Sequence, residues 1–256
     1  MRAALLAAWV VMAAGCGGGA AGNADNPSRD PVSGSVDVFA AASLTSAFRE
    51  EATAFQRQHR EASVRFNFAG SSALATQIGQ GATADVFASA DLPNMQKVAA
   101  AGVTDGQPRT FAANKLQIVV GAGNPKAIRS LRDLADPALA VVLCAPAVPC
   151  GNYAQQAFKK AGVTVTPKSQ EQDVNAVVSK VSFGEADAGV VYVTDIRAAG
   201  SRVQGIAIPD AENVAATYPV VTLKTGSNRA GGAAFVDFLL GREGQQVLGR
   251  YGFVKP

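Results

Sequence analysis

Small or polar residues stand at four places in this sequence where an apolar run gives way to a helix-like run. They are Ser43 in AAASLTSAF, Ser71 and Ser72 in FAGSSALATQ, Cys150 and Gly151 in AVPCGNYAQQAF, and Asp173, followed by Val174, in SQEQDVNAVV. The first turn of a helix carries unpaired N–H donors and a partial positive charge. If these helix starts converge, they form a site for an anion that needs neither lysine nor arginine.

Ordinary helix capping is the alternative explanation for each junction taken alone. Serine and aspartate are among the commonest N-cap residues, so a cap would account for Ser43, Ser71 or Asp173. The small residues around the first two junctions favour a ligand, because they let the backbone approach it closely. Tyr192 in DAGVVYVTD ends a strand-like run and is a fifth candidate, although a tyrosine there is also typical of a core.

A hydrolase that uses Ser43 or Ser71 is the alternative from another class. A serine nucleophile needs an adjacent base, and the chain's single histidine, His59, lies in the charged stretch QRQHRE. Neither serine has the G-x-S-x-G context of a nucleophile elbow, and the acidic residues show no metal-ligand spacing. We therefore expect no enzyme activity, no cofactor and no metal ion held directly by side chains.

The elements that must position these residues alternate along the chain. Strand-like runs cover residues 36–42, 63–70, 84–90, 115–123, 139–146, 188–194, 203–209 and 218–224. Helix-like runs cover 46–60, 73–79, 93–101, 151–161, 174–183 and 230–250. This alternation predicts an α/β protein built around mainly parallel sheets. Eight strands are many for one compact sheet in a chain of this size, which favours two lobes.

Composition excludes several classes of protein. The chain has 256 residues, 48% of them hydrophobic, which is enough for one large domain or two small lobes with proper cores. Its net charge is +3, without a long basic block, and its aromatic content is 7%. These values do not favour nucleic-acid binding.

The N-terminal segment has the pattern of an export signal. Arg2 precedes the apolar run of residues 3–14, which is shorter than the roughly 20 residues needed to span a bilayer. The run ends in AAGC, which resembles a lipobox, with alanine where leucine is usual. We therefore predict a signal peptide over residues 1–15 and a lipid on Cys16; an ordinary secretory signal is the alternative. The Gly/Ser/Pro/Asn-rich residues 16–35 would form a flexible tether.

The remaining cysteines, Cys144 and Cys150, lie close together in CAPAVPC. A disulfide is the expected state of such a pair outside the cytoplasm. A metal site would need further ligands, and none are grouped nearby in the sequence.

Several of these stretches together resemble one family. VFAAASL, FAGSSALA, ADVFASAD, VPCGNYA, EQDV, GVVY and the ending RYGF are similar to segments of the extracytoplasmic molybdate-binding proteins of ABC uptake systems, over nearly all of residues 36–253. The resemblance implies the type II periplasmic-binding-protein fold, in which two α/β lobes joined by crossing strands hold an oxyanion in the cleft between them. It places lobe 1 at residues 36–114 and 206–256, and lobe 2 at 115–205.

The resemblance also implies a ligand set and a function. Ser43, Ser71 and Tyr192 would give hydroxyls, and Cys150 and Val174 would give backbone N–H groups; Cys150 departs from the small inert residue usual in the family. The ligand would be molybdate or tungstate, and the partner an ABC permease. The protein would act as a monomer outside the cytoplasm, held to the cell membrane by the lipid on Cys16. A binder of sulfate or another oxyanion is the alternative within the same fold.

Overall fold

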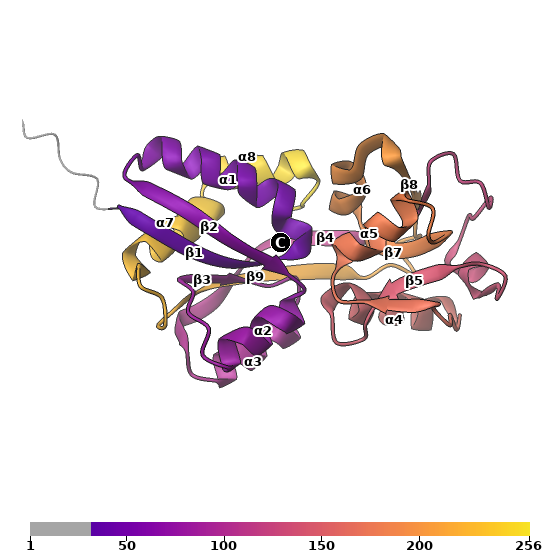
Figure 1. Cartoon of the computed structure of the whole chain (residues 1–256), viewed down its shortest axis with the longest axis horizontal. Coiled ribbons are helices and arrows are strands. Elements are labelled where there is room, and N and C mark those ends of the chain that lie inside the picture. The colour runs from indigo at the N-terminus through magenta and orange to yellow at the C-terminus, as the bar shows by residue number, and fades with distance from the viewer. Residues whose placement is uncertain (1–31) are drawn as a thin grey trace, which may run out of the picture.

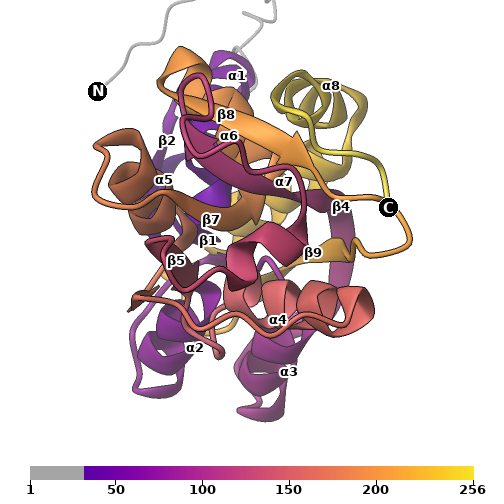
Figure 2. The ribbon, with the colours of Figure 1, turned by 90° about the vertical axis from the view of Figure 1, so that its right-hand side faces the viewer.

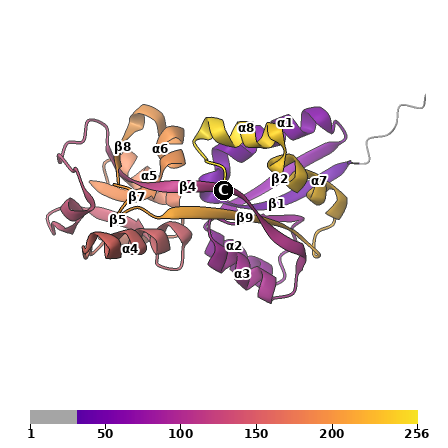
Figure 3. The ribbon, with the colours of Figure 1, turned by 180° about the vertical axis from the view of Figure 1, so that it is seen from behind.

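The structure is a computed structural model that describes residues 32–256, and it has two lobes joined by long strands (Figure 1). Lobe 1 contains the strands β1 (Gly34–Ala41), β2 (Ala62–Ala69) and β3 (Val86–Ala88). Lobe 2 contains β5 (Val141–Cys144), β6 (Ser169–Glu171), β7 (Ala188–Tyr192) and β8 (Val203–Ala207). The strands β4 (Thr104–Gly121) and β9 (Ala215–Leu223) run side by side from one lobe to the other (Figure 3).

The sheet is mixed, and the direction of its strands follows the division into lobes. Hydrogen bonds connect the strands in the order β2-β1-β3-β9-β4-β7-β5-β6, with β8 also paired to β4. Pairing is parallel between β1 and its neighbours β2 and β3, and between β5 and its neighbours β6 and β7. The crossing strands pair antiparallel with all their neighbours. Each lobe therefore has a parallel core, as the sequence predicted, bounded by antiparallel crossing strands.

Helices cover both faces of the sheet in each lobe. Those of lobe 1 are α1 (Thr45–Gln58), α2 (Ser71–Gly79), α3 (Leu92–Ala100), α7 (Arg229–Leu240) and α8 (Arg242–Tyr251). Those of lobe 2 are α4 (Pro149–Ala161), α5 (Val174–Ser182) and α6 (Val193–Ala199), with α4 on the opposite side of β5 and β7 from α5 and α6 (Figure 2). Short 3₁₀ turns are η1 (Ala42–Leu44), η2 (Leu131–Ala135) and η3 (Gly200–Arg202).

The strand β4 changes partners in the middle of its length. Residues up to Lys115 pair with β9, and residues from Leu116 onward pair with β7 and β8. The residue limits that we assigned to the two lobes stay a prediction, since strand pairing describes the sheet and not how the lobes move.

Several element boundaries differ from those predicted. The first strand begins at Gly34, inside the predicted tether, because Gly34 already pairs with Ala62 of β2. The predicted helix over 230–250 is two helices, α7 and α8, since Gly241 between them has an extended backbone with φ −72° and ψ 169°. The predicted signal peptide, Cys16 and the tether up to residue 31 lie outside the described residues.

Three further differences concern the end of one predicted strand and two segments that the sequence patterns did not indicate. The predicted strand over 188–194 stops at Tyr192, where the Asp195 carboxylate accepts a hydrogen bond from the Tyr192 N–H at 2.9 Å and the helix α6 begins. The strand β6 consists of the polar residues SQE and has no apolar signal. The first half of β4 contains Gly106 and Pro108, which the patterns of regular strands exclude.

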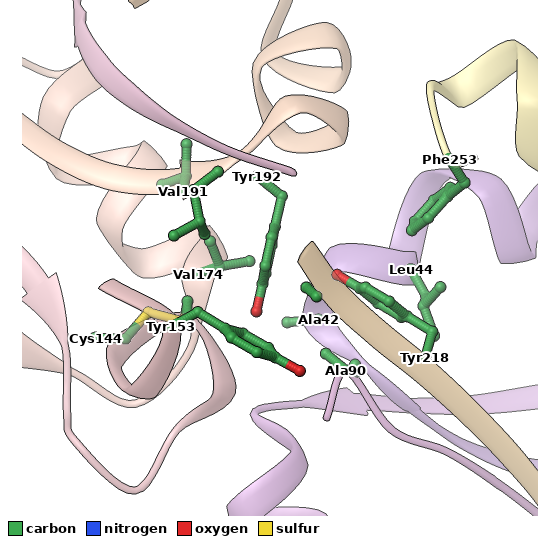
Figure 4. Packing of buried hydrophobic residues seen from close by; sticks show 14 of the residues in the cluster. Ala42, Leu44, Ala90, Cys144, Tyr153, Val174, Val191, Tyr192, Tyr218 and Phe253 are labelled. Carbon is green, nitrogen blue, oxygen red and sulfur yellow. A yellow bond between two sulfur atoms is a disulfide. The ribbon is translucent and has the colours of Figure 1, made fainter. Parts of the chain in front are cut away.

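Aromatic rings fill the centre of lobe 1 and continue to the junction of the lobes. Phe235 of α7 meets Phe48 and Phe55 of α1 edge to face, with ring centroids 5.9 and 5.4 Å apart. At the junction, Tyr218 of β9 meets Tyr192 and Phe253 in the same way, at 6.0 and 5.3 Å (Figure 4). Such contacts stabilise beyond the area they bury and fix the position of β9 between the lobes.

One carboxylic acid lies in this core without a partner. Glu51 of α1 is fully buried, and neither of its carboxylate oxygens has a hydrogen bond within residues 32–256. Arg250 of α8, which could neutralise it, is paired with Glu50 instead. Burial therefore raises the pKa of Glu51 to about 9. A raised pKa means that folding favours the protonated acid, so the contribution of Glu51 to the free energy of unfolding is greatest below pH 4.5 and decreases as the pH rises toward 9.

We expect Glu51→Gln to remove this loss of stability. At pH 7.5 the neutral variant should be more stable than the wild type by up to about 4 kcal/mol, from 1.36 kcal/mol per pKa unit, whereas the two should be similar near pH 4. Thermal unfolding of both proteins between pH 4 and 9 measures the difference. Glu50→Gln is the control. In this variant stability should still decrease as the pH rises, because Glu50 pairs with Arg250 and its pKa is lowered. Parallel pH profiles for wild type and Glu51→Gln would contradict the assignment.

Candidate functional site

A small cavity between the lobes brings the five predicted site residues together. Its lining consists of Ala41, Ala42, Ser43, Gly70, Ser71, Ala90, Val148, Pro149, Cys150, Val174 and Tyr192. The empty space between these residues, including the part open to solvent, is about 190 Å³. No lysine, arginine, aspartate or glutamate is among these lining residues. That Ser43, Ser71, Cys150, Val174 and Tyr192 bind a ligand stays a prediction, but the structure places all five where they could.

The two serines of lobe 1 do not cap helices. Ser43 lies in η1, directly after β1, and its Oγ is 2.9 Å from the Tyr218 Oη. Ser71 is the first residue of α2, after the N-cap Gly70, and its Oγ accepts a hydrogen bond from the Ala90 N–H at 3.0 Å. Both hydroxyls are held by the body of lobe 1 at the wall of the cavity. Ordinary capping, the alternative explanation, is therefore wrong for these two serines.

Lobe 2 presents two helix N-termini to the same cavity. Cys150 is the second residue of α4 and Val174 is the first residue of α5. The first N–H groups of a helix have no partner within it, so these two amides are available as donors. Asp173 caps α5 by accepting from the Ala176 N–H at 3.0 Å, as the sequence predicted. The Asp173 side chain thus stabilises the first turn of α5, which carries the Val174 amide.

The predicted disulfide between Cys144 and Cys150 is confirmed. It joins the end of β5 to the first turn of α4, with the two Cα atoms 5.7 Å apart. The closed loop contains Val148 and Pro149, which line the cavity. The turn is tight, because a Cβ added at Gly151 would lie 2.2 Å from the Ala145 carbonyl oxygen. The disulfide therefore fixes the loop whose Cys150 amide faces the cavity.

Tyr192 supplies the third hydroxyl of the cavity. It is the last residue of β7, is 1% exposed, and points toward the space between the lobes (Figure 4). Its Oη has no hydrogen-bond partner within the part of the chain that the structure describes. Burial raises the pKa of Tyr192 well above 10, so the hydroxyl keeps its proton. A buried O–H without a partner is costly in a folded protein and is a donor available to a guest.

The electrostatics of the cavity come from backbone dipoles. The N-termini of α2, α4 and α5 face it, and each carries partial positive charge. Nearby Asp195 is buried behind Tyr192, and burial raises the pKa of its carboxyl to about 8. Much of its negative charge is therefore suppressed at neutral pH. Together these features suit an anion bound by uncharged donors.

The lobes are in contact around the cavity. The Asn175 Nδ2 of lobe 2 donates to the Ala42 carbonyl of lobe 1 at 3.2 Å, and Asn94 Nδ2 of lobe 1 is 3.5 Å from the Ala147 carbonyl of lobe 2. A Cβ added at Gly70 would lie 2.3 Å from the Gln172 carbonyl oxygen. Any side chain at Gly70 would therefore push the lobes apart. The arrangement is a closed one in which both lobes complete the cavity wall.

Comparison with known proteins places this chain in a family. The model of the bacterial extracellular solute-binding protein family matches residues 36–254. The chain belongs to this family. Together with the relatives and solved structures below, this match confirms the resemblance inferred from the sequence motifs and the two-lobed fold.

Named relatives and solved structures agree with this placement. The molybdate-binding protein ModA of Mycobacterium tuberculosis is 46% identical over 222 residues, which are 87% of this chain and 85% of the relative. ModA of Escherichia coli is 33% identical over 230 residues, covering 86% of this chain and 89% of the relative. The periplasmic molybdate-binding protein of Azotobacter vinelandii has the same fold, with a TM-score of 0.76, 21% identity, and coverage of 86% of this chain and 99% of that one.

The site gives no support to the serine hydrolase alternative. His59 follows the C-terminal end of α1 and packs on the Phe55 ring, with centroids 4.6 Å apart. Ser43 lies just before the other end of that helix. At a rise of 1.5 Å per residue, the 14 residues of α1 separate the two side chains by about 20 Å. Within residues 32–256 the structure also contains no group of three or more His, Cys, Asp or Glu side chains that could hold a metal ion.

Sequence reasoning missed two kinds of residue at this site. Gly70, Ala90 and Val148 line the cavity but carry no functional group of their own. Tyr218 and Asn114, which come from the crossing strands, support Ser43 from behind. Nothing in a single sequence marks Tyr218 as more than a core residue of a strand. Only the fold shows that its hydroxyl reaches the site.

Proposed function

We propose that this protein captures molybdate, and also tungstate, outside the cytoplasm and delivers it to the permease of an ABC importer. The observation that carries the proposal is the cavity between the lobes, which is lined by three buried hydroxyls and by the helix starts at Cys150 and Val174. The two relatives named molybdate-binding protein ModA, at 46% and 33% identity, support the choice of anion.

The donor set matches the protonation state of such an anion. Molybdate at neutral pH is a fully deprotonated tetrahedral dianion, so every group that contacts it has to donate. Hydroxyls and backbone N–H groups do so, and hydrogen bonds to a charged acceptor are the stronger kind. Because the donors are uncharged, the protein never has to bury an unpaired cation when no anion is bound.

Both lobes contribute donors, which couples binding to closure. Ser43 and Ser71 belong to lobe 1, whereas Cys150, Val174 and Tyr192 belong to lobe 2. An anion that contacts both sets binds the closed arrangement more tightly than an open one, and so shifts the population toward closure. The crossing strands β4 and β9 connect the lobes and are the natural hinge. The permease would then recognise the closed, loaded monomer.

A sulfate binder is the strongest competitor within the fold. The sulfate-binding protein SubI of Mycobacterium tuberculosis has a TM-score of 0.75 to this chain at 20% identity, covering 86% of each chain, which shows a shared fold and no more. Sulfate has the charge and shape of molybdate but is smaller. Selectivity between them should therefore follow how closely the cavity wall fits the anion.

We expect removal of a single hydroxyl to weaken molybdate binding markedly. Ser43→Ala, Ser71→Ala and Tyr192→Phe should each lower affinity by roughly ten- to a hundredfold, or about 1.5–3 kcal/mol, since each leaves a charged oxygen short of one donor. Val174→Ala should change affinity much less, because the backbone amide remains. Calorimetric titration with molybdate, tungstate and sulfate measures these effects.

Ser72→Ala is the matched control for this experiment. Ser72 is the neighbour of Ser71 in α2 but does not line the cavity, so its loss should leave affinity near that of the wild type. Tungstate should bind about as well as molybdate, and sulfate far more weakly. Wild-type affinity in both Ser43→Ala and Ser71→Ala would refute the site, and equal affinity for sulfate and molybdate would refute the choice of ligand.

We also propose that a lipid on Cys16 holds the protein at the outer face of the cell membrane. Within residues 32–256 the structure has no helix long and apolar enough to cross a bilayer. Stable attachment by lipid needs more than one acyl chain, and a multiply acylated cysteine provides this. Cys16→Ala should release the protein into the medium, as cell fractionation would show. Membrane retention of the variant, together with an unmodified Cys16 in the wild type by mass spectrometry, would contradict the proposal.

A further inference from the structure

Tyr218 lies directly behind one wall of the cavity without lining it. It is a residue of the crossing strand β9 and is fully buried at the junction of the lobes (Figure 4). Its Oη is 2.9 Å from the Ser43 Oγ. Two hydroxyls at this distance share one hydrogen bond, in which either could be the donor. The direction matters, because a hydroxyl has only one proton to give. If Ser43 donated to Tyr218, it would have no proton left for an anion.

The surroundings of Asn114 favour one direction. The Asn114 Oδ1 accepts a hydrogen bond from the Lys115 N–H at 3.0 Å, and a backbone N–H can only donate. The other end of the amide, Nδ2, is therefore the NH₂ group, and it is 2.9 Å from the Thr194 Oγ1 and 3.5 Å from the Tyr218 Oη. Asn114 thus donates toward Tyr218. The phenol oxygen of Tyr218 accepts, and among the described residues the Ser43 Oγ at 2.9 Å is the acceptor toward which its own proton can point.

Ser71, the second serine of lobe 1, also accepts a hydrogen bond from the protein, but its donor is a backbone N–H. The Ser71 Oγ accepts from the Ala90 N–H at 3.0 Å, a bond that cannot reverse. Both serines are therefore acceptors toward the protein, and each keeps its proton for the cavity. Burial also raises the pKa of Tyr218, so the phenol holds the proton that it gives to Ser43 across the neutral pH range.

We propose that Tyr218 is a positioning residue that fixes the Ser43 hydroxyl as a donor to the anion, by way of the ordered chain from Asn114 to Tyr218 to Ser43. This inference rests on the proposed function, since it concerns the same anion. It assigns a role in binding to a residue that does not touch the ligand. It also explains why a fully deprotonated anion is favoured: on the lobe 1 side, the orientation of the hydroxyl protons is fixed by the fold.

A double-mutant cycle tests the role of Tyr218. Molybdate affinity is measured by calorimetry for the wild type, Tyr218→Phe, Ser43→Ala and the double variant. Tyr218→Phe keeps the ring contacts but frees the Ser43 hydroxyl to rotate, which should weaken binding by roughly five- to thirtyfold. In the Ser43→Ala background the same change should weaken binding by less than about twofold, because the hydroxyl that it orients is already gone.

A matched control separates this role from general loss of stability. Thr222 lies on the same strand, and its Oγ1 donates to the Asp105 carbonyl at 2.7 Å, far along β9 from the cavity. Thr222→Val should lower the melting temperature but leave molybdate affinity unchanged. If Tyr218→Phe binds as the wild type does, or weakens binding equally in both backgrounds, the positioning role is refuted. If the wild type itself binds neither molybdate nor tungstate, the proposed function fails, and the role of Tyr218 fails with it.

Discussion

Removing a doubly charged anion from water is costly unless the protein replaces the water with donors aimed at its oxygens. In the proposed site those donors would be uncharged, so no single one of them would be strong enough, and several must converge. Hydroxyls and helix starts project from the ends of strands in both lobes, and only contact between the lobes brings them together. Closure of the lobes is therefore the condition on which the rest of the site depends.

The crossing strands serve both lobes at once. They join the two parallel cores, and they also carry Tyr218 and Asn114, whose side chains lie at the junction. Asn114 of β4 bonds to Thr194 of α6 in lobe 2, while Tyr218 of β9 bonds to Ser43 of lobe 1. A change in the angle between the lobes would disturb this small network. Tyr218 and Asn114 thus connect the relative position of the lobes to the orientation of the Ser43 hydroxyl.

Many features of the fold and of the candidate site could be predicted from the sequence, because local sequence patterns determine them. Small residues at the strand-to-helix junctions indicated Ser43 and Ser71, and the close pair Cys144 and Cys150 indicated the disulfide, which the structure confirms. What could not be predicted depends on contacts between distant segments. Tyr218 is 175 residues from Ser43 in the chain, and its hydroxyl becomes important only when β9 crosses between the lobes. Glu51 likewise looks like a surface residue of a charged helix until α8 covers it.

In the proposed complex, one tetrahedral dianion sits between the lobes and is held by uncharged donors alone. Diffraction from crystals grown with molybdate, measured at the molybdenum absorption edge, locates the metal directly. We expect one anomalous peak in the cavity, with the anion oxygens about 2.7–3.1 Å from the Ser43, Ser71 and Tyr192 hydroxyls and from the Cys150 and Val174 amides. A peak elsewhere, or an anion held by a lysine or arginine side chain, would contradict the account.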